Sequence, residues 1–137
     1  MQKVGVSQKA VILNEKGKFL VIHRTTTAPS NPNKWDLPGG DLDFGEDAIM
    51  GLTREVKEET GLEIKDPEPF DVESHINENG EFWVTIAYRA KAAVLDKVVL
   101  SFEHDEFKWV TAKEFLKLES SNKLRRFVKN LEKGRTK

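Results

Sequence analysis

The residues with the clearest capacity for chemistry are three glutamates, Glu55, Glu58 and Glu59, which follow Arg54 closely. On a helix, positions i, i+3 and i+4 lie on one face, so the three carboxylates would share one patch. Their mutual repulsion costs about 0.2–0.5 kcal/mol for each exposed pair. Carboxylate oxygens are ligands that Mg²⁺ and Mn²⁺ prefer. The cluster therefore predicts a divalent metal site, although a solvated helix face would have the same composition.

A fixed spacing of glycines and charged residues surrounds this cluster. Glu46 follows Gly40 after five residues, Arg54 follows Glu46 after seven, and the run ends with Glu55, Val56, Glu58, Glu59, Gly61 and Leu62. This pattern resembles the Nudix box, G-x5-E-x7-R-E-U-x-E-E-x-G-U with U a bulky aliphatic residue, at every position. Seven fixed residues at about 5–7% background each would match by chance on the order of 10⁻⁹ to 10⁻⁸. The resemblance favours the metal site over a solvated face.

The resemblance to Nudix hydrolases implies a reaction and a set of roles. The reaction is hydrolysis of a phosphoanhydride bond in a nucleoside diphosphate derivative, with Mg²⁺ or Mn²⁺ as the cofactor. The implied metal ligands are Glu55, Glu58 and Glu59. Glu55 is also the implied general base, which Arg54 would orient, so Arg54, Glu55 and Glu58 form the expected catalytic set.

An acid outside the box is the alternative source of the base. Some Nudix enzymes take their general base from a loop elsewhere in the chain. The residues of this sequence that lie in such a segment are Glu103, Asp105 and Glu106.

Candidates for substrate binding lie just before the box. Gly39 and Gly40 let the backbone approach a ligand closely, and a carbonyl at Gly39 could join the metal ligands. Arg24 ends a predicted strand and could contact phosphate, and Trp35 could stack on a nucleobase. Each has a plainer alternative, which is a simple turn for the glycines, a surface role for Arg24 and core packing for Trp35.

Two further positions within the box have structural interpretations. Straight helical register places Glu46 on the face opposite Glu55, so Glu46 is expected to act in capping or pairing. Gly51 costs roughly 1 kcal/mol against alanine inside a helix. Room for a metal or phosphate and close helix packing explain this glycine equally well.

The elements that must position these residues are mostly strands. Runs of β-branched, aliphatic and aromatic residues predict strands at Val6–Leu13, Phe19–Ile22, Phe70–Ile76, Phe82–Ala90, Val94–Phe102 and Glu106–Val110. Helical spacing and capping patterns predict helices at Glu46–Thr60, after Thr111 and at Ser121–Glu132. The apolar stripe of the box helix is Ile49, Leu52 and Val56. The class is α+β, and the resemblance implies the Nudix fold, a mixed β-sheet sandwiched between helices (an α/β/α sandwich).

Length and composition set the outer limits. A chain of 137 residues with 38% hydrophobic and 33% charged residues predicts one domain, residues 1–137. The absence of cysteine excludes disulfides and thiolate metal sites. No signal-peptide pattern and no run of about 18–20 apolar residues is present, so a cytoplasmic location without a membrane partner is expected. The net charge of −1 disfavours nucleic acid as a partner, and the basic stretch Lys123–Lys137 is expected to be a solvated helix face.

The substrate is expected to be a nucleotide-type small molecule. The lead-in sequence WDLPGG resembles MutT-like enzymes, which makes a nucleoside triphosphate, cleaved to monophosphate and pyrophosphate, the first choice. A nucleotide sugar or another nucleoside diphosphate derivative is the alternative substrate. A nucleotide-sensing Nudix domain without turnover is the alternative of another class, which the intact box disfavours. Homodimers are common among relatives, but nothing in the sequence decides the oligomeric state.

Overall fold

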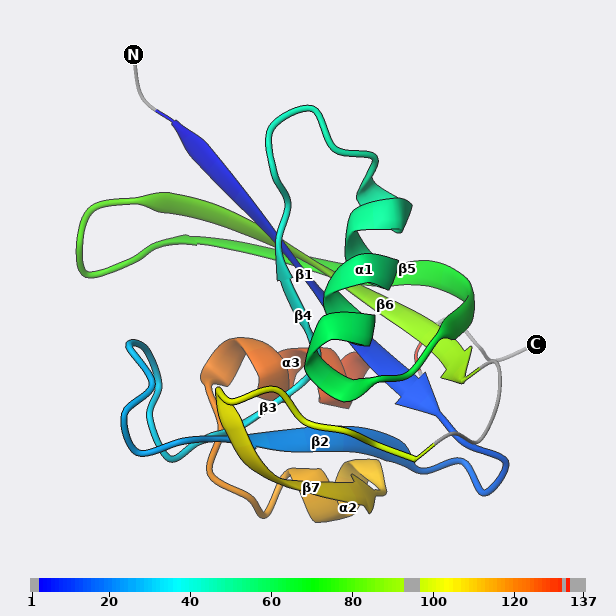
Figure 1. Ribbon diagram of the computed structural model, residues 1–137. Coiled ribbons are helices and arrows are strands. Elements are labelled where there is room, and N and C mark those ends of the chain that lie inside the picture. Colours follow the sequence, from blue (N-terminus) through cyan, green and yellow to red (C-terminus); the bar gives the residue numbers. More distant parts are fainter. Residues whose placement is uncertain (1–2, 93–96, 132, 134–137) are drawn as a thin grey trace.

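The part of the chain that the structure describes, residues 3–92, 97–131 and 133 of a computed structural model, consists mainly of strands, with helices between and after them (Figure 1). The strands are β1 (Val4–Leu13), β2 (Phe19–Arg24), β3 (Trp35–Asp36), β4 (Gly39–Asp41), β5 (Ile64–Ile76), β6 (Phe82–Ala92) and β7 (His104–Val110). The helices are α1 (Ala48–Thr60), α2 (Ala112–Phe115) and α3 (Asn122–Asn130). The predicted class, α+β, is confirmed.

One mixed sheet connects all the described strands. Its main path runs β3-β2-β1-β6-β5, while β4 pairs with β1 and β7 pairs with β2. Strands β1 and β2 form a hairpin in which Leu13 lies opposite Phe19. Strand β1 also pairs in parallel with β6 along its whole length, from Val4 opposite Phe82 to Leu13 opposite Lys91. This parallel pairing joins segments that are distant in sequence, and no local pattern predicts it.

Both faces of the sheet are buried, because consecutive residues of the central strands are apolar and point to opposite faces. In β1, Ala10 and Ile12 face one core and Val11 faces the other. The first core includes Leu52 and Val56 of α1, and the second includes Phe127 of α3. Figure 1 shows α1 in front of the sheet and α3 behind it. The predicted arrangement of a mixed sheet between helices is therefore confirmed.

The predicted apolar stripe of α1 holds for two of its three members. Leu52 and Val56 are fully buried, but the side chain of Ile49 is 40% exposed and its neighbour Met50 is 70% exposed. The first turn of α1 therefore contributes little to the core, which begins at Gly51 and Leu52.

The sequence predicts a strand at Val94–Phe102. This prediction is wrong for residues 97–102, which is the part that the structure describes. Residues 93–96 lie outside the described residues. The backbone N–H groups of Val99 and Ser101 donate to the carbonyls of Thr60 (2.9 Å) and Glu59 (3.2 Å). This segment therefore caps the last turn of α1 instead of joining the sheet, and it supplies part of the hydrogen bonding that a helix C-terminus lacks.

Strand β5 begins at Ile64, whereas the sequence predicts a start at Phe70. Pro67 and Pro69 therefore lie within the strand. Both prolines are tolerated because β5 is an edge strand and its pairing with β6 shifts register between Lys65 and Glu68 and again between Pro69 and Asp71. The helix predicted at Ser121–Glu132 is confirmed at its core, with Ser121 as the N-cap of α3. No helix in the described ranges is both long enough and apolar enough to span a bilayer.

Candidate active site

Helix α1 holds the acidic residues of the box between two well-defined ends. At its start the carboxylate of Asp47 accepts from the N–H of Met50 (3.0 Å). At its end Gly61 adopts the left-handed conformation (φ 77°), which glycine adopts without a steric penalty. These caps fix the helical register, so Glu55 and Glu59, four residues apart, face the same direction.

The two glycines of β4 bring the backbone directly against these carboxylates. The N–H of Gly39 donates to Oε1 of Glu59 at 3.0 Å. A Cβ at Gly39 would collide with the carbonyl of Gln8, and a Cβ at Gly40 would overlap the carboxylate of Glu55. Gly39 is therefore required by the close approach of β4 to β1, and Gly40 leaves room for the carboxylate of Glu55, so the pair is more than a simple turn.

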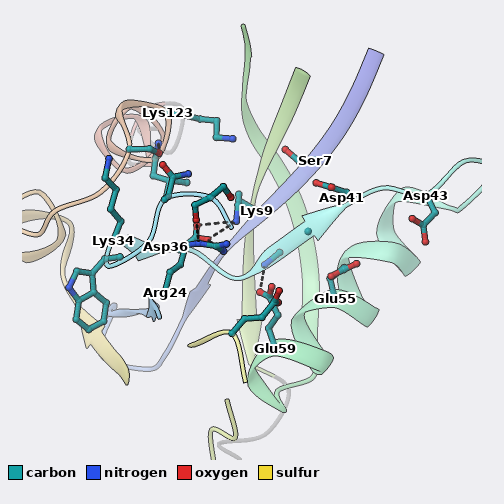
Figure 2. A pocket seen from close by; sticks show the side chains of 18 residues that line it. Ser7, Lys9, Arg24, Lys34, Asp36, Asp41, Asp43, Glu55, Glu59 and Lys123 are labelled. Carbon is teal, nitrogen blue, oxygen red and sulfur yellow. Dashed lines mark hydrogen bonds and ion pairs between the residues drawn. The ribbon is translucent and has the colours of Figure 1, made fainter. Parts of the chain in front are cut away.

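A cavity of about 420 Å³ lies between α1, β4 and the N-terminus of α3. Figure 2 shows the carboxylates of Asp41, Asp43, Glu55 and Glu59 on the side of α1, with Lys34 and Lys123 on the opposite side. The cations that line the cavity are Lys9, Arg24, Lys34 and Lys123. A ligand that carries both a metal ion and several negative oxygens would match this separation of charge.

Burial perturbs the acids that face the cavity. Burial raises the pKa of Glu59 to about 7, although Lys9 and the N–H of Gly39 act in the opposite direction. Burial also raises the pKa of Glu55, against the effect of Arg54. Oxygen donors held together in this way, and incompletely compensated by cations, fit a hard divalent ion.

The three glutamates of the box do not converge on one point. Among the described residues no three acidic, histidine or cysteine side chains form a ready-made metal cluster. Glu55 and Glu59 line the cavity, whereas the side chain of Glu58 is 59% exposed and contacts Nη1 of Arg54 at 3.3 Å. The role of Glu58 as a metal ligand stays a prediction.

Arg54 connects the helix to the loop before it. Its Nε donates to Oε2 of Glu46 at 3.0 Å, and its Nη1 lies 3.2 Å from Oε1 of Glu55. Glu46 precedes α1, so the helical register that places it on the opposite face does not apply, and that expectation is wrong. Its expected pairing role is present, with Arg54 as the partner. Gly51 makes room for Glu46, since a Cβ there would lie 2.8 Å from Cδ of Glu46.

The remaining predicted residues divide into those that line the cavity and those that do not. Arg24, Trp35 and Glu103 line it. Trp35 is only 8% exposed and belongs to the core, as its plainer alternative expects, and its stacking on a nucleobase stays a prediction. Oδ1 of Asp105 lies 2.8 Å from Nδ1 of His23, and Glu106 is paired opposite His23 in the sheet. Neither of these two acids lines the cavity.

Two charged residues of the site escape the sequence patterns. Lys9 lies in β1, where its Nζ is 3.0 Å from Oδ1 of Asp36 and donates to the carbonyl of Leu37. Burial alone would lower the pKa of Lys9, but the carboxylates of Asp36 and Glu59 together outweigh burial and raise this pKa. The sign that could have identified Lys9 is a lone charged residue within a strand whose other residues are all uncharged. Lys123, expected on a solvated face, instead lines the cavity.

A family model described as the NUDIX domain matches residues 3–131 of the chain. The chain belongs to this family. The NUDIX chain is similar to a MutT protein of Methanosarcina mazei Go1, with a TM-score of 0.83 and 31% identity over 99% of this chain and 98% of that one. The family and fold that the box predicts are thus confirmed.

Curated relatives of the NUDIX chain carry related names. It is 33% identical over 100 residues to a putative 8-oxo-dGTP diphosphatase 2 of Mycobacterium tuberculosis, covering 72% of this chain and 69% of that protein. It is 38% identical over 60 residues to a MutT-like protein of Streptomyces ambofaciens, covering 44% of this chain and 36% of that protein. The matches span only 16% to 24% of the length of several other curated relatives.

Proposed function

We propose that this NUDIX chain hydrolyses a phosphoanhydride bond in a nucleoside diphosphate derivative, with a divalent metal ion as cofactor. The observation that carries the proposal is the cavity itself, where Glu55 and Glu59 form one wall and the cations Lys34 and Lys123 lie on the opposite side. A polyphosphate that brings a metal ion would place this ion at the carboxylates and its remaining oxygens at the lysine and arginine side chains.

The residues that would hold the metal ion are Glu55 and Glu59, with Glu58 and the carbonyl of Gly39 as the further predicted ligands. Mg²⁺ or Mn²⁺ would neutralise charge on the phosphoryl oxygens and acidify a bound water. Two of the predicted general bases line the cavity. Glu55 is the first choice because Arg54 orients it at 3.2 Å, and Glu103 is the alternative because it also lines the cavity.

A nucleoside triphosphate is the first choice of substrate, cleaved to monophosphate and pyrophosphate. The names of two similar proteins, a MutT protein and a putative 8-oxo-dGTP diphosphatase, support this choice. A nucleotide sugar is the second candidate, and a second cavity of about 920 Å³ that adjoins the first favours it. That cavity presents Asn77, Asn79 and Glu81, whose side chains suit hydroxyl groups.

The decisive experiment is a hydrolysis assay with Mg²⁺ and a panel of nucleoside triphosphates, nucleotide sugars and dinucleoside polyphosphates, with products separated by chromatography. Turnover of at least one of these substrates is expected, and Glu59→Gln should reduce it by orders of magnitude. Glu63→Gln is the matched control, because Glu63 is exposed and lies just beyond the helix. Tight nucleotide binding with no product over hours would replace this proposal with a sensing role.

A further inference from the structure

The first turn of α3 places Lys123 where the two cavities meet. Ser7, Asp41 and Lys123 line both the cavity of about 420 Å³ and the adjoining cavity of about 920 Å³. Figure 2 shows Lys123 on the far side of the first cavity from Glu55 and Glu59. A substrate that extends from the acidic wall into the second cavity would therefore pass this side chain.

Lys123 differs from two other cations of the site in its partner. Lys9 lies 3.0 Å from Asp36, and Arg24 lies 3.4 Å from the same carboxylate. The ammonium of Lys123 instead donates to the hydroxyl of Thr85 at 3.1 Å, and it forms no ion pair within the described part of the chain. Burial and the charge of Lys9 lower the pKa of Lys123, as expected for a cation without a close counter-ion. Two of its three N–H donors are left for a ligand.

Ser7 joins Lys123 and Thr85 in a small hydrogen-bond network. The hydroxyls of Ser7 and Thr85 lie 2.7 Å apart, because β1 and β6 pair in parallel with these residues opposite each other. Thr85 is fully buried and Ser7 is 8% exposed, so both are rigidly placed. If the Thr85 oxygen accepts from Lys123, its proton is free to be donated to Ser7. Ser7 then has its own proton to donate into the cavity.

We propose that Lys123 and Ser7, positioned by Thr85, form an oxyanion subsite for a phosphoryl group of the substrate that lies away from Glu55 and Glu59. This inference rests on the proposed function and deepens it. The substrate needs at least two phosphoryl groups, one at the acidic wall and one at Lys123. Lys123 thus sets specificity for the phosphate chain by binding, and it takes no part in bond cleavage.

The lining of the second cavity limits which chemical group can lie beyond that phosphoryl group. Among its described lining residues Lys123 is the one Lys or Arg, while Asp41, Glu73, Glu78 and Glu81 are acidic. A further run of phosphates in this cavity would be repelled. The group beyond the subsite is therefore uncharged, as a nucleoside or a sugar is, and a long polyphosphate bridge is disfavoured.

The test compares Lys123→Met with Lys129→Met, which removes an exposed cation from the same helix. Lys123→Met should raise KM for the substrate about tenfold to a hundredfold with kcat changed less than about threefold, the size expected for one lost charge-assisted hydrogen bond. Lys129→Met should leave both constants unchanged. Thr85→Val should raise KM by a smaller factor than Lys123→Met does. Thr85→Ser, which keeps the hydroxyl, should have the KM of the wild type. Melting temperatures verify that all four variants are folded.

Calorimetric titration with inorganic pyrophosphate separates this inference from the proposed function. Weaker pyrophosphate binding in Lys123→Met, but not in Lys129→Met, supports the subsite even if the wild-type protein hydrolyses no nucleotide. Equal affinities and equal KM values in Lys123→Met and wild type overturn the subsite and leave the proposed hydrolysis intact. A similar loss in both lysine variants also overturns it, because that result reflects only overall charge.

Discussion

At the scale of single residues, position 40 controls how the acids meet β4. Gly40 has ordinary backbone angles, but a methyl group there would overlap the carboxylate of Glu55. Gly40→Ala should therefore displace Glu55 and lower the hydrolysis rate by at least about tenfold, the scale seen when a positioned catalytic group is lost. Steady-state kinetics on the substrate found in the panel assay would measure this.

Gly45→Ala, in the loop that follows β4, is the matched control. A Cβ at Gly45 meets nothing within 4 Å, although its φ of 81° makes alanine strained there. This variant should lose stability by about 1 kcal/mol, because alanine is strained at positive φ, and keep its rate. A normal rate in Gly40→Ala, or an equal loss in both variants, would contradict the role of Gly40.

Glu58 provides a second test at this scale. Its side chain is exposed and contacts Arg54, so it can join a bound metal ion only by leaving that contact. Glu58→Gln is expected to lower activity by orders of magnitude and to raise the Mg²⁺ concentration needed for half-maximal rate. A metal titration of wild type and Glu58→Gln would check this. An unchanged Mg²⁺ requirement would remove Glu58 from the ligand set.

At the scale of elements, α3 is fastened to the edge strand β5 by one carboxylate. Asp71 accepts from Nδ2 of Asn130 at 2.8 Å and lies 3.2 Å from Nη2 of Arg126. Burial opposes ionisation, but these two donors and the N–H of Val72 together outweigh burial and hold the pKa of Asp71 below its ordinary value. A lowered pKa stabilises the folded state above about pH 4. That contribution disappears as the pH falls through the folded-state pKa.

The expected result is a pH-dependent difference between wild type and Asp71→Asn. Wild type should be the more stable at pH 7, and the difference in urea midpoint should shrink below about pH 4. Asp66→Asn serves as the control because Asp66 is exposed in the same strand. A difference that stays constant from pH 7 to pH 3 would show that the charge of Asp71 is not the cause.

At the scale of the whole molecule, two cores share one sheet. Leu52 of α1 and Phe127 of α3 are fully buried on opposite faces. Leu52→Ala should cost about 2–5 kcal/mol and Phe127→Ala about 3–5 kcal/mol. Both variants should unfold in a single transition, because neither helix has a core independent of the sheet.

Ile49→Ala is the control for the core substitutions, since Ile49 belongs to α1 but is 40% exposed. It should cost about 0.5 kcal/mol or less. Urea unfolding followed by circular dichroism and by tryptophan fluorescence would measure all three variants. Two separate transitions in Leu52→Ala or Phe127→Ala would show that the two faces of the sheet unfold independently.

The sequence by itself determined the local parts of the site. The helical period fixes the relation of Glu55 to Glu59, and Gly61 fixes the C-terminal end of their helix. The capping box at Thr111 and Glu114 forms as predicted, because both partners lie within one turn. These features depend on neighbours a few residues apart, so a linear pattern contains them.

Only the tertiary structure decided which distant side chains share the cavity. The pairing of β1 with β6 places Ser7 beside Thr85, and Lys123 reaches Thr85 from α3. The tertiary structure also decided that residues 97–102 cap α1, although their composition is typical of a strand. Long-range strand pairing depends on the summed burial of two whole faces of the sheet, and no short window of sequence contains that sum.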